Sequence, residues 1–180
     1  MLDPNIGARP VFDGGALISA LDTRRATLGL DWNQLAHELW DQSGDLNAEL
    51  AGNSLCSGAL VRTAKRQTMS CQYAVMILRW IDRPPEDFLF EPVVAVGDTR
   101  LPTAGPDRRL RWNLPQLHSA VNERRGQERL TWAALADQLS CTPGRVTNLR
   151  AARLADMDLA MRITQWLRLP AASFIHPERW

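Results

Sequence analysis

An internal duplication limits the fold of this chain more than any other feature. A shift of 100 positions aligns the front of two units, and a shift of 86 positions aligns their back. The change between the two shifts places an insertion in the first unit, at about residues 41–55. The chain therefore builds one supersecondary unit twice. The aligned pairs include Arg24 with Arg124, Trp32 with Trp132, Leu35 with Leu135, Trp80 with Trp166 and Phe88 with Phe174.

The duplication also predicts the domain organisation. We expect a first domain over residues 12–91, a linker over residues 92–109 and a second domain over residues 110–180. The linker is rich in proline and glycine, which interrupt both helices and strands. Its apolar residues 93–96 are interpreted as an extended segment that packs on a domain surface.

Apolar residues within each unit recur at steps of three and four, which is typical of helices packed on a core. In the second unit this pattern predicts helices at about 116–126, 132–139, 143–151 and 156–168, with a short turn near 171–175. Thr142 is a good N-cap, and Pro143 suits the first helical position. Because no segment alternates in hydropathy over six residues, we expect no strands. The predicted fold class is all-α, with five short helices in each unit.

A three-residue turn, residues 140–142, separates the second and third helices of the second unit. Residues 135–149, followed by residues 166–170 and Phe174, resemble the Cro/phage-repressor (XRE-like) helix-turn-helix family. The resemblance implies two tandem five-helix lambda-repressor-like helix-turn-helix domains joined by the linker. It also implies a transcriptional regulator that binds double-stranded DNA sequence-specifically and acts by operator occupancy. The chain departs from the family at Ser140, where glycine is usual. In the first unit, polar Thr63 stands at the position that Leu149 occupies in the second unit.

The third helix of the second unit carries the predicted base-reading residues, since the N-terminal end of such a helix meets base edges in the major groove. Arg145 is expected to bond a guanine and Asn148 an adenine, while Val146 and Leu149 face the core. Thr142 is expected to hold a phosphate. The predicted DNA-binding residues here are Thr142, Pro143, Gly144, Arg145, Asn148, Arg150 and Arg153, with Arg124 and Arg125 as further backbone contacts.

The first unit offers a weaker counterpart, with Ser57, Arg62, Lys65 and Arg66 as its predicted DNA contacts. Residues 1–106 carry a net charge of −4, whereas residues 107–180 carry +5. A negative field repels a polyanion, so we expect the second unit to supply most of the specificity. The chain is expected to act as an intramolecular pseudo-dimer. The alternative is a homodimer in which the first units dimerise and the second units read DNA.

Composition argues against several other functions. The longest apolar run, residues 74–78, is far shorter than the roughly 20 residues of a membrane span. Three cysteines without a CxxC pair indicate neither a disulfide framework nor a zinc site. No nucleophile elbow or phosphate-cradling loop occurs. We therefore expect a cytoplasmic, bacterial protein that has no metal, cofactor, membrane association or enzymatic activity.

Two further expectations complete the hypothesis. The paired tryptophans Trp32/Trp132 and Trp80/Trp166 are assigned to the core, whereas Trp112 and Trp180 fall outside the periodic faces. The alternative function is a protein–protein interaction module built on helix-turn-helix domains that have lost DNA reading. The acidic first unit with its insertion favours this alternative.

Overall fold

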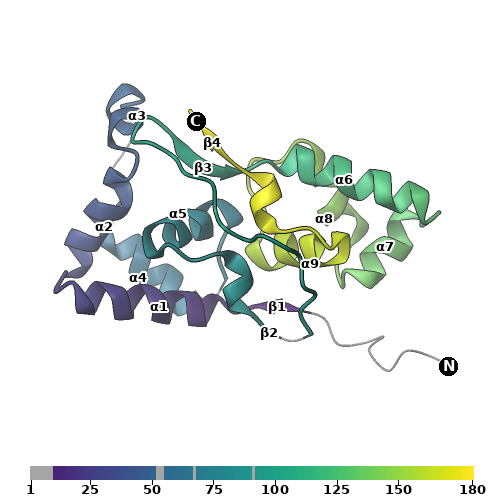
Figure 1. The fold of residues 1–180 in the computed structure, drawn as a ribbon, viewed down its shortest axis with the longest axis horizontal. Helices are drawn as coiled ribbons and strands as arrows, with labels where there is room; N and C mark the ends of the chain where they lie inside the picture. The colour runs from purple at the N-terminus through teal and green to yellow at the C-terminus, as the bar shows by residue number, and fades with distance from the viewer. Residues whose placement is uncertain (1–9, 52–54, 67, 91) are drawn as a thin grey trace.

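The computed structural model describes residues 10–51, 55–66, 68–90 and 92–180, and the chain is mainly helical with a few short strands (Figure 1). None of the helices in these ranges is both long and apolar enough to cross a membrane. The first half contains β1 (Val11–Phe12), α1 (Gly14–Thr27), α2 (Trp32–Asp41), α3 (Gly44–Glu49), α4 (Ser57–Arg66), α5 (Cys71–Ile81), the 3-10 turn η1 (Pro85–Phe88) and β2 (Leu89–Phe90).

The second half repeats this order of elements without a counterpart of α3. It contains β3 (Arg109–Trp112), α6 (Leu114–Gln127), α7 (Trp132–Gln138), α8 (Pro143–Thr147), the 3-10 turn η2 (Asn148–Arg150), α9 (Met157–Leu167), the 3-10 turn η3 (Ala171–Phe174) and β4 (Ile175–Glu178). The predicted helices of this half are confirmed to within two residues, except that the third ends as a 3-10 turn. Helix α3 lies within the predicted insertion.

The fold is mainly helical as predicted, but the expectation that it has no strands is wrong. In each half the first strand pairs antiparallel with the last, so that Phe12 faces Leu89 and Trp112 faces Ile175. These strands are two to four residues long, which is too short for an alternating pattern to show. Their partners lie more than 60 residues apart in sequence, so no local pattern predicts the pairing.

The two halves share one hydrophobic core, which continues from one half into the other. Trp112 is among its largest fully buried side chains, although its position falls outside the helical periodicity. It is buried because it points inward from β3. Trp80 is also buried, whereas Trp32, Trp132 and Trp166 pack against the core with part of each ring exposed.

An approximate two-fold axis relates the halves, because the main backbone contacts between them occur in pairs with the roles exchanged. The amide of Cys71 donates to the carbonyl of Ala155 at 2.8 Å, and the equivalent amide of Met157 donates to the carbonyl of Met69 at 3.0 Å. Helix α5 contacts β3, just as α9 contacts β1. Such reciprocal contacts are typical of a two-fold symmetric dimer, here formed within one chain.

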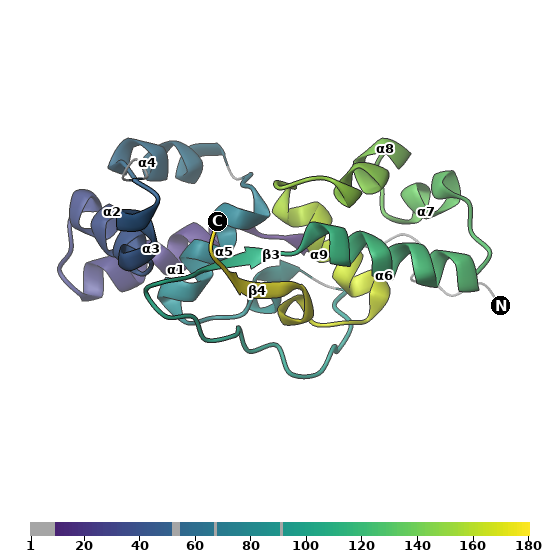
Figure 2. The same cartoon turned by 90° about the horizontal axis from the view of Figure 1, so that it is seen from above.

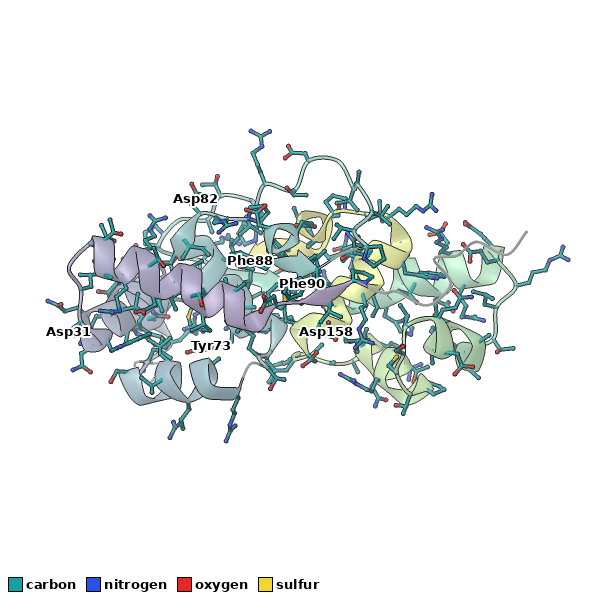
Figure 3. The ribbon with its side chains drawn as sticks, turned by 90° about the horizontal axis from the view of Figure 1, so that it is seen from below. Asp31, Tyr73, Asp82, Phe88, Phe90 and Asp158 are labelled. Carbon is teal, nitrogen blue, oxygen red and sulfur yellow. The ribbon has the colours of Figure 1, made fainter. Side chains whose placement is uncertain are left out.

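Side chains repeat the same exchange at the strands. The amide of Phe12 donates to Asp158 Oδ1 at 3.0 Å, and the equivalent amide of Trp112 donates to Gln72 Oε1 at 2.9 Å. In Figure 3 the labelled Asp158 lies beside β1. The side chains at these equivalent positions, Asp158 and Gln72, differ in charge although they accept equivalent hydrogen bonds.

The connection between the halves runs extended along the surface and bonds to both of them. The amide of Val94 donates to Gln165 Oε1 on α9 at 2.7 Å, and Arg79 on α5 donates to the carbonyl of Ala104 at 2.7 Å. Figure 2 shows this connection along the edge opposite α4 and α8. It therefore leaves the face that carries those two helices uncovered.

Candidate nucleic-acid interface

The turn between α7 and α8 is shaped by its own backbone. Ser140 has a φ of 49°, in the left-handed region, at the position where the family resemblance leads us to expect glycine. The amide of Cys141 donates to the carbonyl of Ala136 at 2.9 Å. Thr142 takes the N-cap position and Pro143 opens α8, as predicted. The Thr142 side chain makes no capping hydrogen bond to α8, and the residue is exposed.

Arg162 on α9 ties this turn to the other half of the molecule. Its guanidinium donates to the carbonyls of Leu139 and Ser140, the latter at 3.1 Å. It also pairs with Asp158 at 2.8 Å, one helical turn earlier. Because Asp158 accepts the amide hydrogen of Phe12, a continuous set of polar contacts joins the turn to β1. The i,i+4 spacing of Asp158 and Arg162 predicts their ion pair. No pattern in the sequence predicts that Arg162 also donates to the carbonyls of the turn.

The predicted orientation of α8 is confirmed. Val146 and Leu149 are buried, with exposed fractions of 0% and 2%. The predicted base-reading residues lie on the opposite, outward side of α8 and η2. The exposed set comprises Thr142, Pro143, Gly144, Arg145, Asn148 and Arg150.

The cations around α8 differ in how strongly they are engaged by the protein. The Arg145 side chain is 46% exposed and reaches the carboxylate of Asp156 only at 4.0 Å, a contact worth little at a surface. Arg153 is exposed, but its guanidinium lies 5.7 Å from the ring centre of Trp180. Arg145 is therefore the more available of the two.

Arg124 and Arg125, which we expected to contact the DNA backbone, are engaged by groups of the protein itself. Arg124 donates to the carbonyl of Leu167 at 2.9 Å and lies over the ring of Trp166, while Arg125 donates to the carbonyl of Leu130 at 2.6 Å. The equivalent arginines of α1 make the same contacts. Arg24 and Arg124 therefore satisfy orphan carbonyls at the ends of α5 and α9, whereas Arg25 and Arg125 hold the loops that follow their own helices.

Helix α4 presents a smaller set of cations. Arg62 and Arg66 are exposed, and Ser57, its first residue, is partly buried. The side chain of Lys65 lies outside the described part of the chain. The first half therefore offers two exposed guanidiniums on α4 in the described structure, at positions that differ from that of Arg145.

A polar pair replaces apolar packing beneath α4. Thr63, the equivalent of Leu149, donates to the carbonyl of Ala59 at 3.0 Å and interacts with the phenol of Tyr73. Tyr73, labelled in Figure 3, is in turn the equivalent of Leu159. Burial raises the pKa of Tyr73 to about 12, although Thr63 lowers it, so the phenol stays neutral. Helix α4 tolerates a polar residue on its inner side because the Thr63 hydroxyl donates to a carbonyl of the same helix.

Helices α4 and α8 lie on the same face of the molecule, toward its two ends (Figures 2 and 3). No aspartate or glutamate occurs in residues 50–81 or in residues 138–155, the stretches that contain the two helices. Both helices are therefore locally basic, although the first half as a whole is acidic. A face of this kind attracts phosphate.

Other reactive groups offer no comparable site. Within the described ranges, no three His, Cys, Asp or Glu side chains gather closely enough to hold a metal ion. Burial raises the pKa of Cys71 to about 11, so its thiol stays protonated. His118 stacks on Trp132 with 5.4 Å between ring centres, and burial, followed by the charge of Arg150, lowers its pKa.

Compared with models of known protein families, with curated proteins and with solved structures, the chain gives no significant match. Its function is therefore inferred from its own residues and their arrangement.

Proposed function

We propose that this protein binds double-stranded DNA sequence-specifically, as a single-chain pseudo-dimer of two XRE-like helix-turn-helix domains. Helix α8 is the main recognition helix and α4 makes a second contact on the same duplex. In this proposal the protein regulates transcription by occupying its operator. The order helix, tight turn, helix at α7–α8, with a buried inner side and a cationic outer side, supports the assignment.

One observation carries the proposal: the approximate two-fold axis that sets α4 and α8 on one face. Duplex DNA offers successive major-groove segments on one side, one helical turn apart, and paired recognition helices use this spacing. The reciprocal contacts between Cys71 and Ala155 and between Met157 and Met69 fix the two helices relative to each other. The chain needs no second copy to present two helices.

The residues of α8 and η2 divide into two roles. Arg145, in the first turn of α8, and Asn148, the first residue of η2, are exposed and carry the donors and acceptors that suit guanine and adenine edges. Arg150 and the hydroxyl of Thr142 suit phosphate oxygens, which position the protein without reading sequence. On α4, Arg62 and Arg66 suit the backbone of the second half-site.

Selection of bound fragments from a genomic library with the full-length protein tests this proposal. We expect enrichment of a single asymmetric site, because α4 and α8 carry different side chains. Affinity for the enriched site falls with salt, with a log–log slope of about −0.9 for each phosphate neutralised. The absence of any enriched sequence, together with a flat salt response, would contradict DNA binding and favour a protein partner.

A further inference from the structure

An apolar cavity lies between the first half and β3. It has a volume of about 290 Å³, near the lower end of the range for small-molecule sites, about 300–1,000 Å³. Its walls come from α2, α5, β3 and the insertion that contains α3. Because the second half has no such insertion, the duplication did not produce an equivalent cavity there.

Three arginines line this cavity, and the first is held by neutral groups. Arg79 on α5 donates to the carbonyls of Gln42 at 2.8 Å and Ala104 at 2.7 Å. It also donates to the hydroxyl of Ser43 at 3.1 Å. These acceptors orient the guanidinium, but none of them carries a negative charge.

The other two arginines come from β3. Arg109 donates to Oδ1 of Asn47, a residue of the insertion, and lies 5.2 Å from the ring centre of Trp40. Arg111 donates to the carbonyl of Trp180 at 2.9 Å. Strand β3 therefore contributes two positive charges to a cavity built mainly by the first half.

The positive charge of this cavity is not balanced within the described residues. Arg79, Arg109 and Arg111 form no ion pair with an aspartate or glutamate there, whereas eight other arginines each pair with one. Burial lowers the pKa of all three, and for Arg111 the charge of Arg109 lowers it further. Removing charged groups from water is costly unless an opposite charge compensates them. The cavity thus favours an anion.

The remaining walls are mostly apolar. Leu39, Trp40 and Leu55 form part of the lining, together with Met76 and Leu154. Sites for organic ligands combine such walls with a few polar groups that fix orientation. A planar carboxylate also matches the fork of a guanidinium.

We propose that this cavity binds a small organic carboxylate with an apolar body. The guanidiniums of Arg109 and Arg111 hold the carboxylate, and the apolar walls hold the body. Arg79 contributes positive potential while its donors remain on the backbone. The proposal does not depend on DNA binding, and its test contains no DNA.

Isothermal titration of the full-length protein with 2-naphthoate and with its neutral analogue 2-naphthamide tests the proposal. We expect one naphthoate per chain and at least tenfold weaker binding of the naphthamide. Arg109→Met weakens naphthoate at least tenfold and leaves naphthamide unchanged. The matched control Arg100→Met removes an exposed arginine on the connecting segment and changes neither affinity.

A second variant keeps the test valid if Arg109→Met fails to fold. Leu154 is 64% exposed at the edge of the cavity, so Leu154→Glu is tolerated by the fold. Its carboxylate competes for the arginines and should abolish naphthoate binding. Equal affinities for naphthoate and naphthamide, no binding of either, or full naphthoate binding by Leu154→Glu would each overturn the proposal.

Discussion

Helices α4 and α8 occupy equivalent places in the two halves but present different chemistry. Gly58 and Gly144 are equivalent, yet the next position is Ala59 in α4 and Arg145 in α8. Asn148, exposed directly after α8, is equivalent to the exposed Arg62 of α4. One scaffold thus presents an exposed arginine and asparagine in the second half and exposed arginines at other positions in the first. The comparison teaches that duplication preserved the frame while the outward side chains diverged.

The turns before these helices diverged as well. The turn before α8 is three residues long and is held by Arg162 on α9. The segment before α4 contains the insertion, and here Gln42 donates to the carbonyl of Met76, the equivalent of Arg162. The second half therefore joins α7 to α8 through a short turn that is held by side-chain hydrogen bonds. In the first half, the insertion at the same place forms one wall of the cavity.

The largest expected effect tests whether the two halves are one unit at all. Trp112 is 1% exposed in the shared core, so Trp112→Ala should cost about 3–5 kcal/mol of unfolding free energy. Because the core continues through both halves, the variant should unfold in a single transition at lower temperature. Calorimetry of the wild type and the variant measures both the shift and the number of transitions.

The equivalent change in the first half, Phe12→Ala, serves as the matched control. It should shift the same single transition, since Phe12 belongs to the same core. Two transitions, with each variant lowering only one of them, would show that the halves unfold independently. The comparison of α4 with α8 would then concern two separate domains.

The next prediction concerns DNA binding by the two helices. Arg145→Ala should cost about 1–3 kcal/mol of binding free energy and relax preference at one base pair. Arg62→Ala should weaken binding on all sequences alike and reduce the salt slope by about 1. Fluorescence anisotropy on the selected site and on single-base variants separates the two outcomes.

A gain-of-function variant sharpens this comparison. Ala59→Arg places a guanidinium on α4 at the position of Arg145, so affinity should rise and a new base preference should appear in the first half-site. If Arg145→Ala instead weakens binding equally on every sequence, Arg145 is a phosphate contact. The proposed division between the helices would then be wrong.

The sequence predicted well whatever depends on helical periodicity. Positions of α6 to α9, the burial of Val146 and Leu149 and the exposure of Arg145 all follow from local spacing. The strands, the burial of Trp112 and the reciprocal contacts between halves do not, because they join residues far apart in sequence. The sequence also did not predict the role of Arg124. Its charge suggests a DNA contact, but its guanidinium donates to the carbonyl of Leu167 at the end of α9.

A smaller effect is expected at the contact between the turn and the other half. Asp158→Gln copies the equivalent Gln72, which keeps an acceptor for the amide of Phe12 but removes the ion pair with Arg162. The loss should be about 1–2 kcal/mol of unfolding free energy. Denaturant unfolding measures it, and hydrogen exchange at the amide of Cys141 should quicken. Unchanged exchange at that amide would show that the contact does not hold the turn.

The smallest expected effect tests the backbone of the turn itself. Ser140→Gly relieves a left-handed φ that costs a side-chain-bearing residue about 1 kcal/mol, so the variant should gain about 0.5–1 kcal/mol in unfolding free energy. Ser140→Ala retains a Cβ and should gain nothing. If both variants are stabilised equally, the cause is loss of the hydroxyl rather than relief of φ. Equal stability of Ser140→Gly and the wild type would mean that the contacts of Arg162 and Cys141 already offset the strain, so glycine would not be required in this turn.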